Sequence, residues 1–114
     1  MCDMTSVPIK DISYKDRIDK IRTIIPNPAL YEQLAEECVE LSQACLKKAR
    51  KIRGENFTPK LEREIDRELI EEVSDVILCI ETIPLHGDNK IINRKLNRWI
   101  ERNKPKNEES SAKV

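Results

Sequence analysis

The sequence is poor in aromatic residues, with one tryptophan, two tyrosines and one phenylalanine among 114 residues. It also carries no net charge, because 21 basic residues balance 21 acidic ones. A neutral chain has no overall attraction to DNA, RNA or an anionic membrane. With so few rings to stack on bases as well, nucleic-acid binding is disfavoured.

No apolar run approaches the length that spans a membrane, and the amino terminus lacks the apolar segment of a secretory signal. We therefore expect a cytoplasmic protein with no membrane partner. The cysteines contain no C-x-x-C pair of the kind that marks a zinc or redox site. Cys38, Cys45 and Cys79 fall on the apolar sides of expected helices, and we interpret them as small hydrophobic residues in a reduced protein.

A chain of this length forms one domain with a modest core. Charged residues make up 37% of the chain, which suits amphipathic helices that each have one solvent-exposed face. Such helices leave apolar faces that a single subunit does not cover. The composition therefore predicts an oligomer, a homodimer or a homotetramer, in which subunits complete one another's core.

Apolar residues recur with helical spacing throughout, which predicts an all-α helical bundle. Two long antiparallel helices, from Pro28 to Arg53 and from Pro59 to Thr82, are expected between a shorter helix over Tyr14–Ile25 and a last helix after Asp88. Asn27, Thr58 and Asp88 are the expected amino-terminal caps, and Gly54 is the expected carboxyl-terminal cap. The expected organisation is an irregular arm (1–13), a helical domain (14–103) and a disordered tail (104–114).

The two long helices carry the same acidic pattern, Glu36-Glu37-x-x-Glu40 in the first and Glu71-Glu72-x-x-Asp75 in the second. Since a helix turns by about 100° per residue, acids three apart lie on one side of it. In both helices this acidic pair stands at the edge of the apolar stripe. An antiparallel hairpin would therefore bring four carboxylates together, those of Glu37, Glu40, Glu72 and Asp75.

Converging carboxylates repel one another, by about 4 kcal/mol for two charges some 4 Å apart at an effective dielectric of about 20. A divalent cation that prefers oxygen ligands relieves this repulsion, and a single histidine, His86, argues against zinc. The pattern predicts a Mg²⁺ site, with Mn²⁺ also suited, and it points to phosphate chemistry because carboxylate-held Mg²⁺ keeps open positions for phosphates. The alternative is that both acidic pairs are solvated surface that pairs with lysine and arginine.

The segments around these acids resemble the MazG-like all-α nucleotide pyrophosphohydrolases, a superfamily that includes dimeric dUTPases, dCTP pyrophosphatases and phosphoribosyl-ATP pyrophosphohydrolase. Leu-Ala-Glu-Glu-Cys-Val-Glu-Leu-Ser-Gln-Ala is similar to the first metal-binding helix of that family, and Ile-Glu-Glu-Val-Ser-Asp-Val-Ile-Leu-Cys-Ile is similar to the second. The likeness runs from Leu30 to Arg102. The stretch between Glu40 and Glu72 is longer than is common in the family.

The resemblance implies an enzyme of nucleotide-pool housekeeping that cleaves the α–β phosphoanhydride of a nucleoside triphosphate, giving the monophosphate and pyrophosphate. Mg²⁺ would be held by the four acids named above, and Glu36 or Glu71 would accept a proton from the attacking water. Gln33 would line the base pocket. The cations of the last helix, Lys95, Arg98 and Arg102, would bind phosphates, unless they form a solvated helix face.

Two other functions compete with this one. A helical regulatory or adaptor module would use the bundle as a docking surface and perform no catalysis. A phosphoribosyl-ATP pyrophosphohydrolase would turn over that substrate and no deoxynucleotide. Stabilisation of the fold by Mg²⁺ or Mn²⁺ separates an enzyme from an adaptor, because only a binding site gains stability from its ligand.

Overall fold

The computed structural model describes residues 12–55 and 59–105 of the chain. In this part the protein consists of four helices and no strand, which confirms the expected all-α class. The helices are α1 (Ile12–Ile24), α2 (Asn27–Arg53), α3 (Glu62–Thr82) and α4 (Asn89–Arg102). No helix among the described residues is long and apolar enough to cross a membrane.

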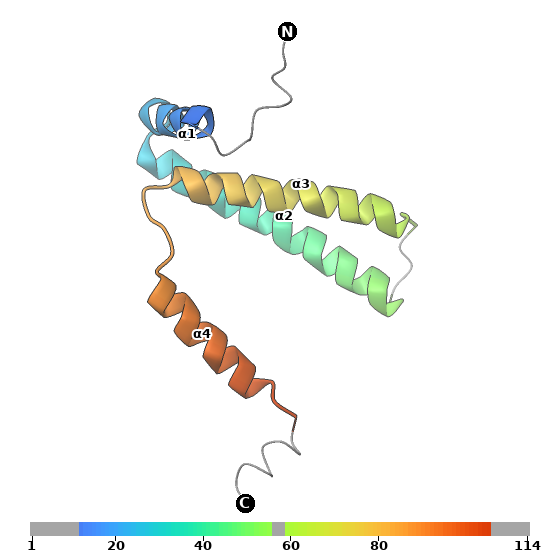
Figure 1. Ribbon diagram of the computed structural model, residues 1–114. Coiled ribbons are helices and arrows are strands. Elements are labelled where there is room, and N and C mark those ends of the chain that lie inside the picture. Colours follow the sequence, from blue (N-terminus) through green and yellow to red (C-terminus); the bar gives the residue numbers. More distant parts are fainter. Residues whose placement is uncertain (1–11, 56–58, 106–114) are drawn as a thin grey trace, which may run out of the picture.

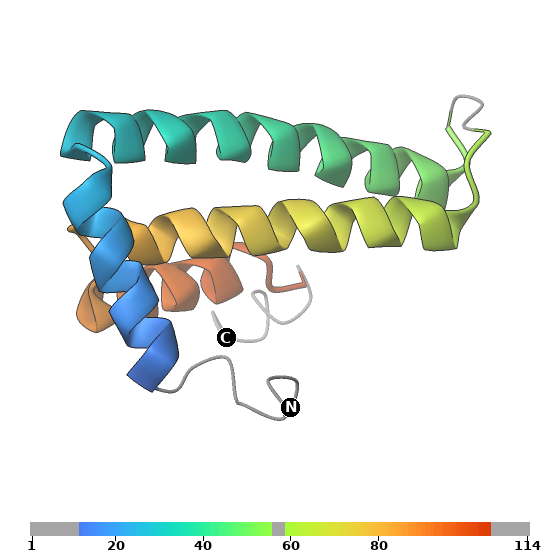
Figure 2. The ribbon, with the colours of Figure 1, turned by 90° about the horizontal axis from the view of Figure 1, so that it is seen from above.

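The long helices α2 and α3 lie side by side and antiparallel, as expected, and their packing is the main tertiary contact of the chain (Figures 1 and 2). The helix α1 crosses the end of this hairpin where α2 begins and α3 ends. The helix α4 leaves on the opposite side of the hairpin from α1 (Figure 1) and makes no extensive contact with the other helices. The two long helices are therefore the frame that positions any shared site.

The core is thin: within residues 12–55 and 59–105 the buried apolar side chains are Ile18, Leu30, Ile65, Val76 and Cys79. The expectation that Cys38 and Cys45 are buried small hydrophobes is wrong, because both are exposed, whereas it holds for Cys79. The side of α2 that faces α3 runs through Leu30, Glu37 and Leu41, and a cysteine one position after Glu37 is turned about 100° away from it.

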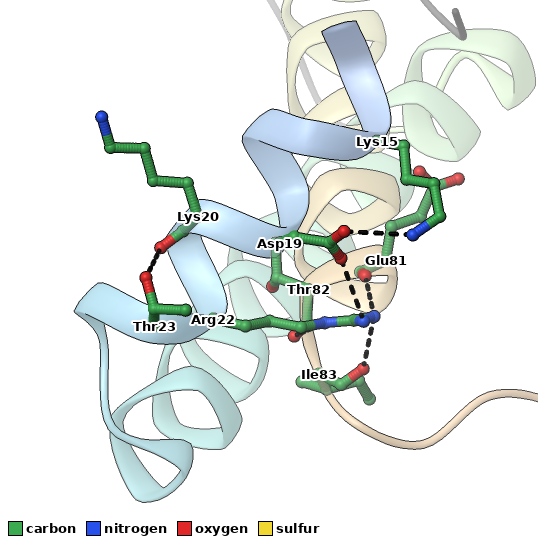
Figure 3. A network of polar contacts seen from close by, with 8 residues as sticks. All are labelled: Lys15, Asp19, Lys20, Arg22, Thr23, Glu81, Thr82 and Ile83. Carbon is green, nitrogen blue, oxygen red and sulfur yellow. Dashed lines mark hydrogen bonds and ion pairs between the residues drawn. The ribbon is translucent and has the colours of Figure 1, made fainter. Parts of the chain in front are cut away.

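Polar contacts hold α1 against the end of α3 (Figure 3). The Arg22 guanidinium donates from Nε to the Thr82 carbonyl at 3.0 Å and from Nη2 to the Glu81 carbonyl at 2.7 Å. These carbonyls belong to the last turn of α3, where no further helical N–H is available to them. The Tyr14 hydroxyl adds a hydrogen bond to the Glu81 carboxylate. Together these bonds fix α1 beside the region where α2 and α3 bring their acids together.

Several helix ends differ from the expected ones. α1 begins at Ile12, two residues before the expected start of the first helix. The expected arm up to residue 11 lies outside the described part, as do Thr58 and the tail from 106 onward. Asn27 is not a cap: α2 starts there, after an extended Pro26 that provides no side-chain hydrogen bond. Pro59 precedes α3, which begins after Leu61, whose N–H donates to Glu64 Oε1 at 2.9 Å.

Two expected caps are confirmed. Asp88 Oδ1 accepts hydrogen bonds from the backbone N–H of Lys90 at 2.8 Å and of Ile91 at 3.1 Å, which satisfies two amides at the start of α4. Gly54 ends α2 in the left-handed conformation, with φ of 70°. Its N–H donates to the Lys51 carbonyl at 3.3 Å. The chain thereby turns toward α3.

Replacing Gly54 by alanine is expected to destabilise the hairpin. A Cβ there would contact nothing within 4 Å, so the cost is that of the left-handed backbone alone, about 1 kcal/mol. Thermal melting followed by circular dichroism should show a drop of roughly 4–8 °C. Gly54→Asn is the matched control and should lose less, because asparagine tolerates this conformation. Equal losses would contradict the assignment.

Candidate metal centre

Three carboxylates meet across the packing surface of α2 and α3. Glu37 and Glu40 are one turn apart on α2, and Glu72 faces them from α3. Each offers a carboxylate oxygen, and these three oxygens lie within 4.8 Å of one another. The sequence predicted that four acids would converge, and the structure brings these three of them together.

Asp75, the fourth expected acid, lies at the edge of this group. It is one turn beyond Glu72 on α3 and is exposed. The pKa of Glu37 is raised first by burial, and the nearby negative charge of Asp75 adds to that rise. With Glu37, Asp75 also lines a cavity beside the group. Asp75 is therefore placed to approach whatever Glu37 binds from the solvent side.

The two half-buried glutamates each hold an oxygen that has no partner. Glu37 Oε2 and Glu72 Oε2 are buried and make no hydrogen bond, while Glu37 Oε1 accepts one from Gln33 Nε2 at 3.0 Å. A buried polar atom without a partner is costly and uncommon in folded proteins. Among the residues that the structure describes, no lysine or arginine forms an ion pair with the three converging glutamates or with Asp75. An oxygen-preferring cation such as Mg²⁺ or Mn²⁺ fits this donor set.

The electrostatics of the group agree with its burial. The pKa values of Glu37 and Glu72 are both raised, first because burial disfavours the charged form and then because the neighbouring acids repel it. Glu40 contributes to both shifts. In the metal-free protein the repulsion between these carboxylates therefore lowers the stability of the fold. A bound cation would offset this repulsion.

The raised pKa values predict a pH dependence for the metal-free protein. A carboxyl group whose folded pKa exceeds its unfolded value of 4.5 binds more protons when folded, so stability falls as pH rises through that window. We expect the melting temperature without metal to decrease between pH 4.5 and neutrality. Glu68, whose pKa is lowered by Lys60, has the opposite effect, but only below 4.5.

Melting curves at several pH values in the presence of a chelator measure this slope. The variant Glu72→Gln should flatten it, because the amide does not titrate. A melting temperature that rises steadily from pH 4.5 to neutrality would contradict the repulsion inferred here.

The proposed proton acceptors, Glu36 and Glu71, are exposed and do not join the group. Each precedes a converging glutamate by one position and is therefore turned about 100° around its helix. This turn takes both acids toward the same side of the hairpin as Glu40 and Asp75, farther from the contact between α2 and α3. The structure thus separates these two acids from the three whose oxygens converge.

The basic row of the last helix stands apart from the carboxylates. Lys95, Arg98 and Arg102 are exposed and line a shallow hollow along α4 together with Ile92, Leu96 and Trp99. Because α4 points away from the hairpin (Figure 1), a single chain does not bring this row to the acidic group.

A cavity of about 270 Å³ adjoins the acidic group and is bounded by α1, α2 and α3. Most of its lining is apolar, and its polar members besides Glu37 and Asp75 are Gln33 and Thr82. Gln33, which was expected to line a base pocket, lies in the wall of this cavity. The other members went unrecognised in the sequence: Ile21, Ile25, Leu30, Leu78, Cys79 and Thr82. The lining residues on α3, Leu78, Cys79 and Thr82, follow Asp75 at intervals of three and four residues. This spacing indicates that they lie on the same side of α3 as Asp75.

Comparison of the chain with protein-family models, with curated proteins and with solved structures finds no match in any of the three. The interpretation of the acidic group therefore depends on the geometry and chemistry of its own residues.

Proposed function

We propose that this chain is a Mg²⁺-dependent nucleoside triphosphate pyrophosphohydrolase that cleaves the α–β phosphoanhydride to give a monophosphate and pyrophosphate. Mn²⁺ is the alternative cation. The observation that carries the proposal is the convergence of Glu37, Glu40 and Glu72, together with two buried carboxylate oxygens that lack a partner. Such a group suits a cation, and an exposed cation held by carboxylates suits phosphate ligands.

The residues of the centre have different proposed roles. Glu37 and Glu72 provide the buried oxygens, and Gln33 orients Glu37 by its hydrogen bond at 3.0 Å. Glu40 and Asp75 are exposed and complete the ligand set on the open side. A bound Mg²⁺ would supply charge neutralisation for phosphate oxygens and a lowered pKa for its water. Glu36 and Glu71 are the proposed acceptors of the proton from the attacking water.

The cavity beside the group suits the nucleoside part of the substrate. Glu37 and Asp75 lie in its wall, so a nucleoside held there would have its phosphates next to the carboxylates. The apolar lining excludes water from a bound base or sugar, and Gln33 and Thr82 offer hydrogen-bonding groups. In this proposal the nucleoside is recognised on the part of the surface next to the carboxylates that hold the cation.

The proposal gives the basic row of α4 a phosphate-binding role only if α4 closes over an acidic group. Lys95, Arg98 and Arg102 lie on a helix that is not packed on its own hairpin. A homodimer or homotetramer is the proposed assembly in which α4 of one subunit approaches another. Charge favours this approach, because α4 is predominantly basic and the centre is acidic.

A substrate panel tests the proposal. The full chain is incubated with Mg²⁺ and each of the common ribonucleoside and deoxynucleoside triphosphates, and also with phosphoribosyl-ATP, and both products are quantified. Pyrophosphate and monophosphate in equal amounts, abolished by a chelator, are expected for at least one substrate. Release of orthophosphate instead, or no turnover of any substrate, would overturn the proposal. Turnover of phosphoribosyl-ATP alone would select that narrower activity.

A non-catalytic adaptor is the second candidate function, and one observation favours it. α4 exposes a stripe of large apolar residues, with Trp99 63% exposed and Leu96 49% exposed. Such a stripe is a typical docking surface for another helix. The adaptor requires no cation, so the effect of metal on stability distinguishes it from the enzyme.

A further inference from the structure

The helix α4 is the most strongly amphipathic of the four helices, and its apolar side has no cover in the described chain. All of its residues are exposed, and it makes no extensive contact with the other helices (Figure 1). The exposed fractions of its large apolar side chains are 52% for Ile92, 49% for Leu96, 63% for Trp99 and 56% for Ile100. Because a helix turns by about 100° per residue, these four form one apolar strip along α4.

The rest of α4 is basic. Its charged residues are one acid, Glu101, and five cations: Lys90, Arg94, Lys95, Arg98 and Arg102. Glu101 already pairs with Lys104, whose Nζ lies 2.9 Å from its Oε2. Within residues 12–55 and 59–105, none of the five cations forms an ion pair. The helix therefore presents apolar surface and unpaired positive charge next to each other.

A partner of α4 must satisfy both the apolar strip and the cations. The acidic group of another copy would pair with the cations and leave the strip in water. A single partner helix contacts one side of α4, so even an acidic helix reaches only the cations next to the strip, Lys95 and Arg102. Neither of these partners accounts for the whole surface.

A bilayer that contains anionic phospholipids meets both requirements, because it offers acyl chains to the strip and negative headgroups to the cations. The potential of a charged surface extends about 10 Å into water at 0.1 M salt, and a helix is about 10 Å across. All five cations of α4 are therefore attracted when the strip lies on the bilayer, including those that point away from it.

We propose that α4 binds the surface of anionic phospholipid membranes, lying parallel to the bilayer with its apolar strip among the outer ends of the acyl chains. Trp99 lies at the edge of the strip that is next to Lys95. Tryptophan and lysine are suited to this position, since each combines an apolar body with a polar end that reaches the headgroups. The binding depends on neither the metal centre nor a nucleotide.

The neutral charge of the whole chain does not oppose this binding. Acidic and basic residues are equal in number, but they are unevenly distributed, with the acidic group in the hairpin and five cations on α4. Charges farther apart than about 8 Å are largely screened at physiological salt, so the local charge of α4 decides its attraction to a surface. The lack of a membrane-spanning segment has no bearing on a helix that lies on the bilayer.

Binding of the full chain to lipid vesicles tests the proposal, with a chelator present and no nucleotide. Vesicles of phosphatidylcholine alone are compared with vesicles of phosphatidylcholine and phosphatidylserine in equal parts. Trp99 is the only tryptophan of the chain, so its fluorescence reports on α4 alone. We expect the chain to float with the anionic vesicles in a density gradient, and the Trp99 emission to shift to shorter wavelength. Added sodium chloride should weaken the binding by screening the cations.

Ile91 and Ile92 provide a matched pair for the apolar strip. They are 41% and 52% exposed, but they are turned about 100° apart, so Ile92 lies in the strip and Ile91 lies among the cations. Ile92→Gln should weaken binding to the anionic vesicles roughly tenfold, because less apolar surface leaves water. Ile91→Gln should bind like the parent. Circular dichroism checks that both variants remain helical.

Arginines on two helices provide a matched pair for the charge. The double variant Arg98→Gln/Arg102→Gln removes two positive charges from α4, and Arg63→Gln/Arg67→Gln removes two from exposed positions of α3. Each cation near an anionic surface strengthens binding roughly fivefold, so the α4 variant should bind about thirtyfold more weakly than the parent. The α3 variant should change the binding little.

Four results would overturn the proposal. The first is a chain that does not float with anionic vesicles, or that binds phosphatidylcholine alone equally well. The second is an equal loss of binding in Ile91→Gln and Ile92→Gln. The third is a Trp99 emission that lies at short wavelength before vesicles are added and does not change with them, which would show that protein covers the strip. The fourth is an emission shift of the same size with inorganic phosphate, which would show that the cations bind a free anion.

Discussion

Glu72→Gln is expected to lower Mg²⁺-dependent pyrophosphate release by roughly a hundredfold or more, since a loss of about 3 kcal/mol of transition-state stabilisation has that effect. The substitution keeps the shape of the side chain and removes its charge. It converts the buried, unpartnered Oε2 of Glu72 into a neutral amide atom that binds a cation poorly. Glu40→Gln should also lose most of the activity, because its oxygen belongs to the same converging group.

The matched control is Glu32→Gln, which removes one charge from an exposed position of α2 outside the converging group. Its turnover should stay near that of the parent. Asp75→Asn is expected to have an intermediate effect, because Asp75 lies at the edge of the group. If Glu72→Gln and Glu40→Gln both retain parental turnover of a substrate that the parent cleaves, the metal assignment is wrong.

Mg²⁺ or Mn²⁺ is expected to raise the melting temperature of the parent by on the order of 10 °C when the cation is about a hundredfold above its dissociation constant. The physical reason is that the cation binds the folded state alone, where it offsets the mutual repulsion of Glu37, Glu40 and Glu72. In Glu72→Gln two effects should appear together. The melting temperature without metal rises, because one repelling charge is gone, and the shift on adding metal largely disappears.

Calorimetry or circular dichroism measures both quantities in one set of samples. Sodium chloride at equal ionic strength is the control, because general screening also weakens repulsion between carboxylates. Absence of any shift in the parent would favour the adaptor over the enzyme. A shift of equal size in Glu72→Gln would show that the cation binds elsewhere. This experiment needs no substrate, so it separates a failed metal site from a wrong choice of nucleotide.

Local signals in the sequence identified the helices well. Gly54 predicted the end of α2 because only a residue that accepts a positive φ closes a helix in this way, and Asp88 predicted the start of α4 by capping free amides. Asn27 failed as a cap because Pro26 already occupies the extended position that a cap requires. When a proline directly precedes a candidate cap residue, either of the two can occupy the N-cap position. The sequence alone did not decide between Pro26 and Asn27.

The sequence by itself determined the angular position of each acid on its helix, since that follows from about 100° per residue. It therefore predicted that the carboxylates of Glu37, Glu40, Glu72 and Asp75 would meet once α2 and α3 formed an antiparallel hairpin, and the first three do so. Only the tertiary structure decided which oxygens are buried, that Asp75 stands at the edge, and that α1 closes a cavity beside them. It also decided that Cys38 and Cys45 are exposed and that α4 stands apart. Helical periodicity determines which residues lie on one side of a helix. Whether those residues are buried depends on whether another helix covers that side, and this follows from packing between segments far apart in the chain.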